Sequence, residues 1–253
     1  MYKRQVYALV TQQNPADVLN QVTSPETGQT ASGEYKPSAQ EEELRKFTAV
    51  TLKDTETVWS KIFRENGRQY VYPKLVMFTG QVESGCGLAD AGMGPFYCGN
   101  DEKVYIDLTF YDMMKSRFGA KGDFAQAYVI AHEVGHHVQK QLGALDKVHA
   151  MRDRMSERQY NQLSVRLELQ ADYYAGVWAH HARQLAELDE SDIKEAMGAA
   201  NAIGDDTLQK QSQGYVKPDA FTHGTSEQRT RWFLKGWRSG DIREGDTFRA
   251  DPL

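Results

Sequence analysis

The sequence contains the motif His132-Glu133-Val134-Gly135-His136 within the segment AHEVGHHVQ. On an α-helix, residues four positions apart differ by about 40° in azimuth, so the two imidazoles lie on the same side. Two neutral imidazoles suit Zn²⁺, and Glu133 can reach a water on the metal and act as a base. The spacing therefore predicts a hydrolytic zinc site.

The helix that carries this motif is predicted to be buried, because apolar residues surround the motif. A pair of core histidines with satisfied hydrogen bonds is the alternative interpretation. Burying two His and a Glu is costly unless something compensates them, and a metal ion would do so. The apolar positions are Phe124, Tyr128, Ile130, Ala131, Val134 and Val138.

The third zinc ligand is predicted in RLELQADYYAG, where Glu168 and Asp172 are four residues apart on a second helix. Both carboxylates then share a face, so Glu168 can bind zinc while Asp172 accepts the free N–H of a ligand imidazole. Glu157 is the alternative, as the carboxylate closest to a position about twenty residues beyond His136. A metzincin is excluded, because Gln139 stands where that motif requires glycine.

The segment FTHGTSEQR places His223 and Arg229 around the start of a further helix. Thr225 and Gln228 have the spacing of a capping box, which predicts where this helix begins. On spacing alone, structural or solvated roles explain His223 and Arg229 as well as a catalytic role does.

Two cysteines, Cys86 and Cys98, lie twelve residues apart in the glycine-rich segment SGCGLADAGMGPFYCGN. Two cysteines cannot form a four-cysteine zinc site, and no histidine lies between them to act as a further ligand. A disulfide that closes a short loop fits best, and it would imply an oxidising compartment. Two buried free thiols in a cytosolic protein are the alternative.

The elements that position these residues are predicted to be a small β-sheet followed almost wholly by helices. Ser38 and Glu41 have capping-box spacing and begin a long helix that ends near Gly67. Apolar runs at 74–79 and 103–108 predict two strands of one sheet, with the cysteine loop between them. This order predicts an α+β fold. Further helices are predicted at 123–142, 156–181, 191–203 and 225–240.

The composition is that of an ordinary globular protein with a polar N-terminal arm. The chain has 253 residues, a net charge of −5 and no cluster of Lys and Arg, so no nucleic-acid partner is expected. Its apolar runs are shorter than the roughly 18 residues that a transmembrane helix needs. Residues 1–38 predict a flexible arm or linker, and residues 39–253 predict a single zinc metallopeptidase domain.

From about residue 41 to residue 248, ordered blocks of the sequence resemble the bacterial neutral zinc metallopeptidase family. The resemblance implies a zincin-like, mostly helical fold with a small β-sheet, and one Zn²⁺ per chain. It also implies an extracytoplasmic location in the cell envelope, on the periplasmic side, behind an N-terminal membrane anchor. The blocks are PKLVMF, MGPFYC, VYIDLTFYD, GDFAQAYVIAHEVGHHVQ, RLELQAD, AIGDD and THGTSEQR.

The chain departs from this family in two respects. No transmembrane segment is recognisable in it, although family members are membrane-anchored. Many members also have one cysteine just after the QAD triplet and another near the C-terminus, where this chain has Tyr173 and Gly245. The resemblance therefore implies that a second disulfide is missing and that Cys86–Cys98 is retained.

The sequence is also similar to the membrane-associated prenyl-protein peptidases and their heat-shock relatives. In those proteins HExxH is followed by E-x-x-A-D, which here is ELQAD, from Glu168 to Asp172. The similarity implies that Glu168 is the third zinc ligand. It further implies that His223 and Arg229, six residues apart, line the same site.

Together these residues predict a zinc-dependent endopeptidase that acts on a peptide or protein substrate. A zinc-activated water attacks the carbonyl, Glu133 transfers its proton to the leaving amine, and His223 and Arg229 stabilise the oxyanion. The 103–108 strand is expected to pair with an extended peptide. Two alternatives stay open: a non-catalytic, zinc-stabilised envelope binding or scaffold protein, and a hydrolase of a non-peptide amide.

Overall fold

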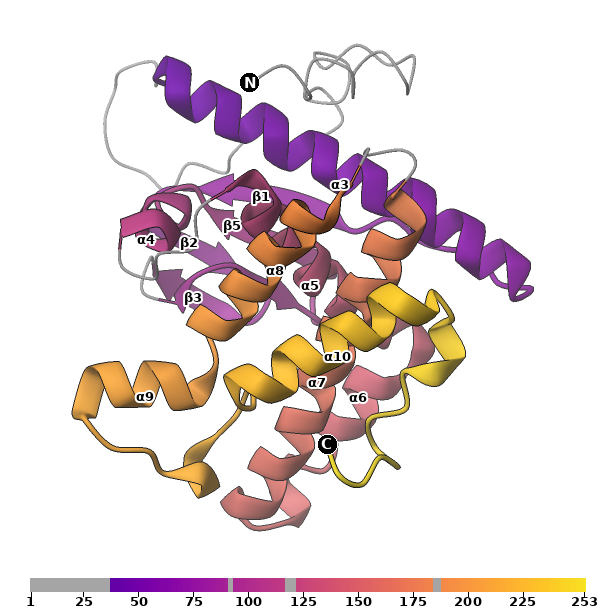
Figure 1. Cartoon of the computed structure of the whole chain (residues 1–253), viewed down its shortest axis with the longest axis vertical. Coiled ribbons are helices and arrows are strands. Elements are labelled where there is room, and N and C mark those ends of the chain that lie inside the picture. Colours follow the sequence, from indigo (N-terminus) through magenta and orange to yellow (C-terminus); the bar gives the residue numbers. More distant parts are fainter. Residues whose placement is uncertain (1–36, 91–92, 117–121, 184–187) are drawn as a thin grey trace.

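The computed structural model describes residues 37–90, 93–116, 122–183 and 188–253. The predicted N-terminal arm, residues 1–38, lies outside the described residues except at its last two positions. The first described helix, α3 (Ala39–Glu65), begins where it was predicted, because the Ser38 side chain accepts a hydrogen bond from the Glu41 N–H. It lies along one side of the molecule, next to β1 (Figure 1).

The predicted small sheet is present and has three strands in the order β1 (Lys74–Phe78), β5 (Lys103–Asp107), β4 (Phe96–Cys98). β1 and β5 are parallel, and β4 is antiparallel to β5. Both faces of the sheet are covered, which explains the continuous apolar runs of β1 and β5. Leu75, Met77, Val104 and Ile106 pack in the main core, while Val76, Phe78 and Tyr105 belong to a second, smaller core.

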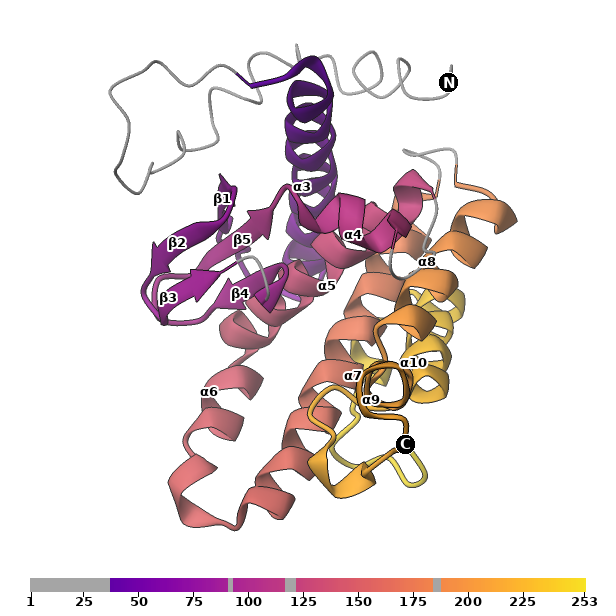
Figure 2. The ribbon, with the colours of Figure 1, turned by 90° about the vertical axis from the view of Figure 1, so that its left-hand side faces the viewer.

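The region between β1 and β5 contains three further strands where a loop was expected. β2 (Gln81–Ser84) and β3 (Gly87–Asp90) form an antiparallel hairpin, and Val82 and Ala89 from this hairpin complete the second core. Figure 2 shows the hairpin on the side of the sheet away from α7 and α10. β5 is the central strand: β1 pairs with it along Lys103–Asp107 and β4 pairs with it at Lys103–Tyr105, so over those three residues both edges are taken and the predicted pairing with a substrate is wrong. On the β4 side the pairing stops at Tyr105, and pairing of a substrate beside Ile106 and Asp107 stays a prediction.

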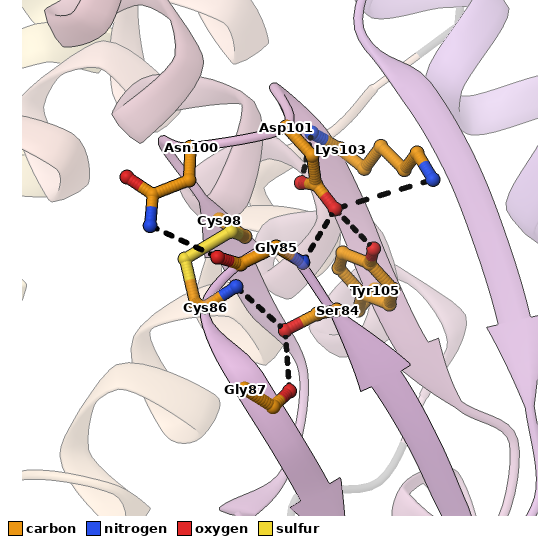
Figure 3. The surroundings of a disulfide bond; sticks show 9 residues. All are labelled: Ser84, Gly85, Cys86, Gly87, Cys98, Asn100, Asp101, Lys103 and Tyr105. Atoms are coloured by element: carbon orange, nitrogen blue, oxygen red, sulfur yellow. Dashed lines mark hydrogen bonds and ion pairs between the residues drawn. A yellow bond between two sulfur atoms is a disulfide. The ribbon is translucent and has the colours of Figure 1, made fainter.

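The predicted disulfide between Cys86 and Cys98 is present (Figure 3). Cys86 lies in the turn of the hairpin, and Cys98 ends β4. Asp101 reinforces this link by accepting hydrogen bonds from the Gly85 N–H at 2.9 Å and from the Tyr105 hydroxyl at 2.5 Å. The hairpin is therefore joined to the three-stranded sheet by a covalent bond and by hydrogen bonds at Gly85.

The helices confirm the predicted α+β class. α5 (Asp123–Leu142) has its predicted bounds and ends at Gly143 in the left-handed conformation. Capping boxes at Ser156 and Thr225 begin α7 (Glu157–Ala182) and α10 (Ser226–Ser239). In the described part of the chain no helix has the length and apolar character required to cross a membrane. The other helices are α4 (Phe110–Ser116), α6 (Ala144–His149), α8 (Glu190–Ala202) and α9 (Asp205–Gln213).

Glycines allow α7 to approach both α5 and α10 closely. A Cβ atom on Gly135 of α5 would lie 2.9 Å from the Ala171 carbonyl oxygen of α7. A Cβ atom on Gly236 of α10 would lie 2.1 Å from the Tyr173 carbonyl oxygen. Side chains too large for these crossings would push the helices apart. The glycines thus bring the carboxylates of α7 within reach of polar side chains on α5 and α10.

Candidate metal centre

The structure brings together the three residues predicted to bind zinc. His132 and His136 lie on α5, and Glu168 lies on α7. The Glu168 Oε2 atom is 3.2 Å from His132 Nε2 and 3.4 Å from His136 Nε2, and one donor atom from each residue lies within 4.8 Å of the others. Their side chains are only 8%, 11% and 15% exposed. The alternative ligand Glu157 is the exposed first residue of α7, three helical turns away from Glu168.

The chemistry of these donor atoms fits a zinc ion. Each imidazole has a hydrogen-bond acceptor at Nδ1 on the side away from Glu168: Asp172 Oδ1 at 2.8 Å for His132 and Gln139 Oε1 at 2.9 Å for His136. With the proton on Nδ1, both Nε2 lone pairs point toward the Glu168 carboxylate. Three electron-pair donors then converge in a buried place, an arrangement that a divalent cation stabilises.

A cluster of charged side chains, Asp172 and Arg229, lies on the Nδ1 side of His132. Asp172 is completely buried and lies within hydrogen-bond distance of three side chains. Its Oδ1 atom accepts hydrogen bonds from His132 and, at 2.5 Å, from the Tyr128 hydroxyl. Arg229 of α10 donates from Nε to Oδ2 at 2.9 Å and from Nη2 to Oδ1 at 3.0 Å. The predicted contact between Asp172 and a ligand imidazole is therefore present in this structure.

The charges of this group shift the pKa values of its members. Burial lowers the pKa of His132, but attraction to Asp172 and hydrogen bonds with Asp172 and Glu168 outweigh it and raise that pKa to about 10. Burial likewise raises the pKa of Asp172, yet Arg229 and His132 bring it down to about 2. The pKa of Glu168 lies well below its usual range, because attraction to His136 and hydrogen bonds from both histidines outweigh its desolvation. In the absence of metal, these interactions therefore favour protonated imidazoles and ionised carboxylates.

A neutral group supports His136. Gln139, three residues further along α5, accepts from His136 Nδ1 and donates to the Leu167 carbonyl and to Gln170 of α7. The sequence interpretation did not identify either glutamine as part of the site. The available signal was positional, since Gln139 follows a ligand by three residues and Gln170 lies between Glu168 and Asp172.

Glu133, the predicted base, is buried next to the ligands and is 7% exposed. Within the described residues, no hydrogen bond or ion pair engages its carboxylate. Its negative charge is the smallest of the causes that shift the pKa of His136 upward, after the attraction and hydrogen bond of Glu168. The three-residue cluster of possible ligands found in the described part of the chain does not include Glu133.

His223 lies on the loop before α10, and its side chain is half exposed. Asp205, at the start of α9, holds this loop: its Oδ2 accepts from the backbone N–H groups of Thr222, His223 and Gly224, and its Oδ1 is 3.2 Å from His223 Nδ1. Burial lowers the pKa of His223, but the hydrogen bond with Asp205 and attraction to Glu168 raise it overall. Asp205 was not singled out from the sequence, although it belongs to the AIGDD block.

Arg229 is placed differently from His223, although six residues separate them. Its buried guanidinium faces Asp172 and Tyr128, behind His132, and its Nη1 donates to the Ile203 carbonyl at 3.3 Å. Arg229 therefore contacts the cluster from the side of Asp172 and His132, and its charge also lowers the pKa of His223.

Tyr173 and Gly245, where the resemblance suggested that a second disulfide is missing, lie next to each other. A Cβ atom on Gly245 would lie 2.5 Å from Cδ1 of the Tyr173 ring, so the glycine leaves room for the tyrosine. The Tyr173 hydroxyl also donates to the Asp241 carbonyl at 2.5 Å. In this chain, packing and hydrogen bonding connect the C-terminal segment to α7 at these positions.

The fold and the cluster agree with what comparison with known proteins finds. A family model described as "Putative neutral zinc metallopeptidase" matches residues 5–248, and the chain belongs to this family. The Escherichia coli K12 protein described as "Uncharacterized protein YpfJ" is 53% identical over 225 residues, which cover 88% of this chain and 78% of the relative. "Uncharacterized protein Mb2605" of Mycobacterium bovis is 41% identical over 195 residues, covering 73% of this chain and 65% of that relative. No solved structure is significantly similar to the chain.

Proposed function

We propose that this protein is a zinc-dependent endopeptidase, with His132, His136 and Glu168 as ligands of one zinc ion and Glu133 as general base. The convergence of the two Nε2 atoms on the Glu168 carboxylate, next to the unengaged carboxylate of Glu133, is the observation that carries this proposal. Two His and one Glu are a usual ligand set of catalytic zinc, which leaves a coordination position open for chemistry.

Zinc, when bound, would supply a Lewis acid that lowers the pKa of water and polarises a carbonyl group. Glu133 takes a proton from the water while the oxygen of that water bonds to the carbonyl carbon of the substrate. Glu133 then gives that proton to the nitrogen as the C–N bond breaks, which leaves a carboxylic acid and an amine. His223, whose pKa is raised by the hydrogen bond with Asp205 and by attraction to Glu168, can keep a proton on Nε2 and donate it in a hydrogen bond to the carbonyl oxygen.

Replacing Glu133 tests this proposal against a zinc-stabilised binding or scaffold protein. Glu133→Gln keeps the size of the side chain and all three ligands, so zinc content should stay at one per chain while hydrolysis of a peptide library falls by about 10²-fold or more. Glu157→Gln is the matched control, because Glu157 is exposed and lies far from the cluster. Equal cleavage by wild type and Glu133→Gln would remove Glu133 from the mechanism, and no cleavage by wild type would favour a scaffold.

We further propose that the protein acts outside the cytoplasm, in the cell envelope, on a peptide or protein substrate. The Cys86–Cys98 disulfide supports this location, because disulfides persist in oxidising compartments. Mass spectrometry of the protein isolated from its natural source should find these cysteines bridged. Two free thiols would contradict the proposed location.

A further inference from the structure

We propose that Gln139 and Gln170 are positioning residues for His136, and that their side-chain amides form a hydrogen-bonded relay from residue 245 to its imidazole. The relay rests on the proposed function only in taking His136 to bind zinc through Nε2. It assigns a role to two buried side chains that neither bind metal nor reach a substrate.

Hydrogen bonds connect the ligand step by step to the backbone near the C-terminus. Gln139 Oε1 lies 2.9 Å from His136 Nδ1. On its other side Gln139 Nε2 donates to the Leu167 carbonyl at 2.6 Å and to Gln170 Oε1 at 3.2 Å. Gln170 Nε2 donates in turn to the Gly245 carbonyl at 2.7 Å. Gln139 is fully buried and Gln170 is 7% exposed, so water does not replace these partners.

The relay has a direction, because backbone carbonyls can only accept hydrogen bonds. The Leu167 carbonyl therefore requires the NH₂ group of Gln139 on its side, and the Gly245 carbonyl requires the NH₂ group of Gln170. With both amides oriented in this way, Gln139 presents its oxygen to His136. That oxygen needs a donor, so the proton of the neutral imidazole belongs on Nδ1.

This direction matters for metal binding because it selects one of the two His136 tautomers. With the proton on Nδ1, the Nε2 lone pair faces Glu168, 3.4 Å away. The other tautomer would point an N–H into the cluster and leave Nδ1 and Gln139 Oε1 as two buried acceptors facing each other. The relay thus holds the imidazole in the form that can bind zinc.

The far end of the relay is fixed because the C-terminal segment is anchored along α7. Arg166 donates to the carbonyls of Thr247 and Ala250, and the Thr247 hydroxyl donates to the Arg166 carbonyl. The Tyr173 hydroxyl donates to the Asp241 carbonyl on the other side of Gly245. Contacts on both sides of residue 245 therefore keep its carbonyl in place for Gln170.

Three variants with the same substitution separate this role from general packing. Gln139→Leu removes the acceptor of His136, whereas Gln170→Leu leaves Gln139 held by the Leu167 carbonyl. Gln141→Leu is the matched control on the same helix, because Gln141 bonds to Val71 and His137 and not to the cluster. Zinc affinity, measured by competition with a chelator, should fall about 10- to 100-fold in Gln139→Leu, a few-fold in Gln170→Leu, and not at all in Gln141→Leu.

A second readout reports the tautomer directly. In long-range ¹H–¹⁵N NMR spectra the His136 Nδ1–H signal should be protected from solvent exchange in wild type and in Gln141→Leu, and lost or shifted in Gln139→Leu. Wild-type zinc affinity together with an unchanged Nδ1–H signal in Gln139→Leu would overturn the relay.

This experiment distinguishes a failure of the relay from a failure of the proposed function. The Nδ1–H signal can also be recorded on zinc-free protein at alkaline pH, where the imidazole carries one proton. A wild-type protein that binds no zinc but shows a protected Nδ1–H that depends on Gln139 would support the relay and contradict the proposed function. A wild-type protein that binds zinc, but whose Nδ1–H signal is unchanged in Gln139→Leu, would contradict the relay and leave the proposed function standing.

Discussion

The two imidazoles of the metal centre have supports of opposite character. Behind His132 the support is ionic, because Asp172 accepts from the imidazole and is itself paired with Arg229 at 2.9 and 3.0 Å. Behind His136 the support is neutral, because glutamine amides connect that imidazole to backbone carbonyls of α7 and of the C-terminal segment. The ionic support needs a charged side chain from α10, whereas the neutral one ends on the backbone carbonyls of Leu167 and Gly245.

The difference shows which properties each support can control. Both fix the orientation of a ring, and both place its proton on Nδ1. Only the ionic support adds charge. Burial lowers the pKa of His132, and attraction to Asp172 is the largest of the causes that raise it. A buried carboxylate, however, must be compensated, and this makes the stability of the fold depend on Arg229. We therefore expect changes in the ionic support to affect folding, metal affinity and pH dependence, and changes in the neutral support to affect metal affinity without changing the pH dependence.

The largest effect is expected from Arg229→Met. The variant leaves Asp172 buried without its guanidinium partner, so the free energy of unfolding should fall by about 3–5 kcal/mol. For a protein of this size that loss lowers the Tm on the order of 10 °C, measurable by calorimetry. Arg166→Met is the matched control, because Arg166 donates to backbone carbonyls and compensates no buried carboxylate in these bonds. A loss no greater than that of the control would show that Asp172 does not depend on Arg229.

A double variant sharpens this test. In Asp172→Asn/Arg229→Met both charges are removed, so its loss of stability should be smaller than the sum of the two single losses. Additive losses would mean that the two side chains contribute independently, and the ionic support would not be a unit.

Asp172→Asn is expected to have the next largest effect, on the metal. The amide can still accept from His132, but the negative charge is gone, so zinc affinity should fall about 10- to 100-fold. The fall should be at least as large as that in Gln139→Leu, measured by the same chelator competition. A larger fall in Gln139→Leu would reverse the comparison, because the neutral support would then matter more than the ionic one.

The pH dependence should also separate the two supports. In the zinc-free protein the His132 pKa of about 10 exceeds its ordinary value of 6.5, so its contribution to stability is complete below pH 6.5 and is lost as the pH rises through 10. Zinc must displace that proton, so apparent zinc affinity should rise with pH up to about 10. Asp172→Asn should end this rise at a lower pH, and Gln139→Leu should leave its position unchanged. Zinc affinity measured at several pH values tests this prediction. Curves that stop rising at the same pH in wild type, Asp172→Asn and Gln139→Leu would contradict it.

Sequence reasoning identified the parts of the site that follow from helical geometry. Residues four apart on a helix share a face, so the pairs His132/His136 and Glu168/Asp172 could be recognised without knowing how the helices pack. The structure brings both pairs together. The helices at 123–142 and 225–240 were also correct, because caps and glycines mark helix ends locally.

The remaining features depend on contacts between elements, which local patterns do not specify. Gln139 and Gln170 support His136 only because α5 crosses α7 closely at Gly135. Arg229 faces Asp172 only because α10 crosses α7 at Gly236. The central position of β5 was missed because β4 has just three residues and lies in a glycine-rich segment that resembles a loop.

The smallest effect, and the one with the most specific sign, is expected from Tyr128→Phe. The Tyr128 hydroxyl donates to the same Asp172 oxygen that accepts from His132. Removing it should lower the free energy of unfolding by about 1–3 kcal/mol, because a hydrogen bond to a buried charge is lost. Zinc affinity should not fall, and should rise up to about three-fold. The reason is that Asp172 Oδ1 then accepts no hydrogen bond from Tyr128 and interacts more strongly with His132.

Tyr111→Phe is the matched control, since Tyr111 is equally buried but bonds to Thr48, away from the cluster. It should lose stability without any change in zinc affinity. A fall in zinc affinity in Tyr128→Phe that exceeds the control would mean that the hydroxyl positions Asp172, and that this support acts by geometry more than by charge.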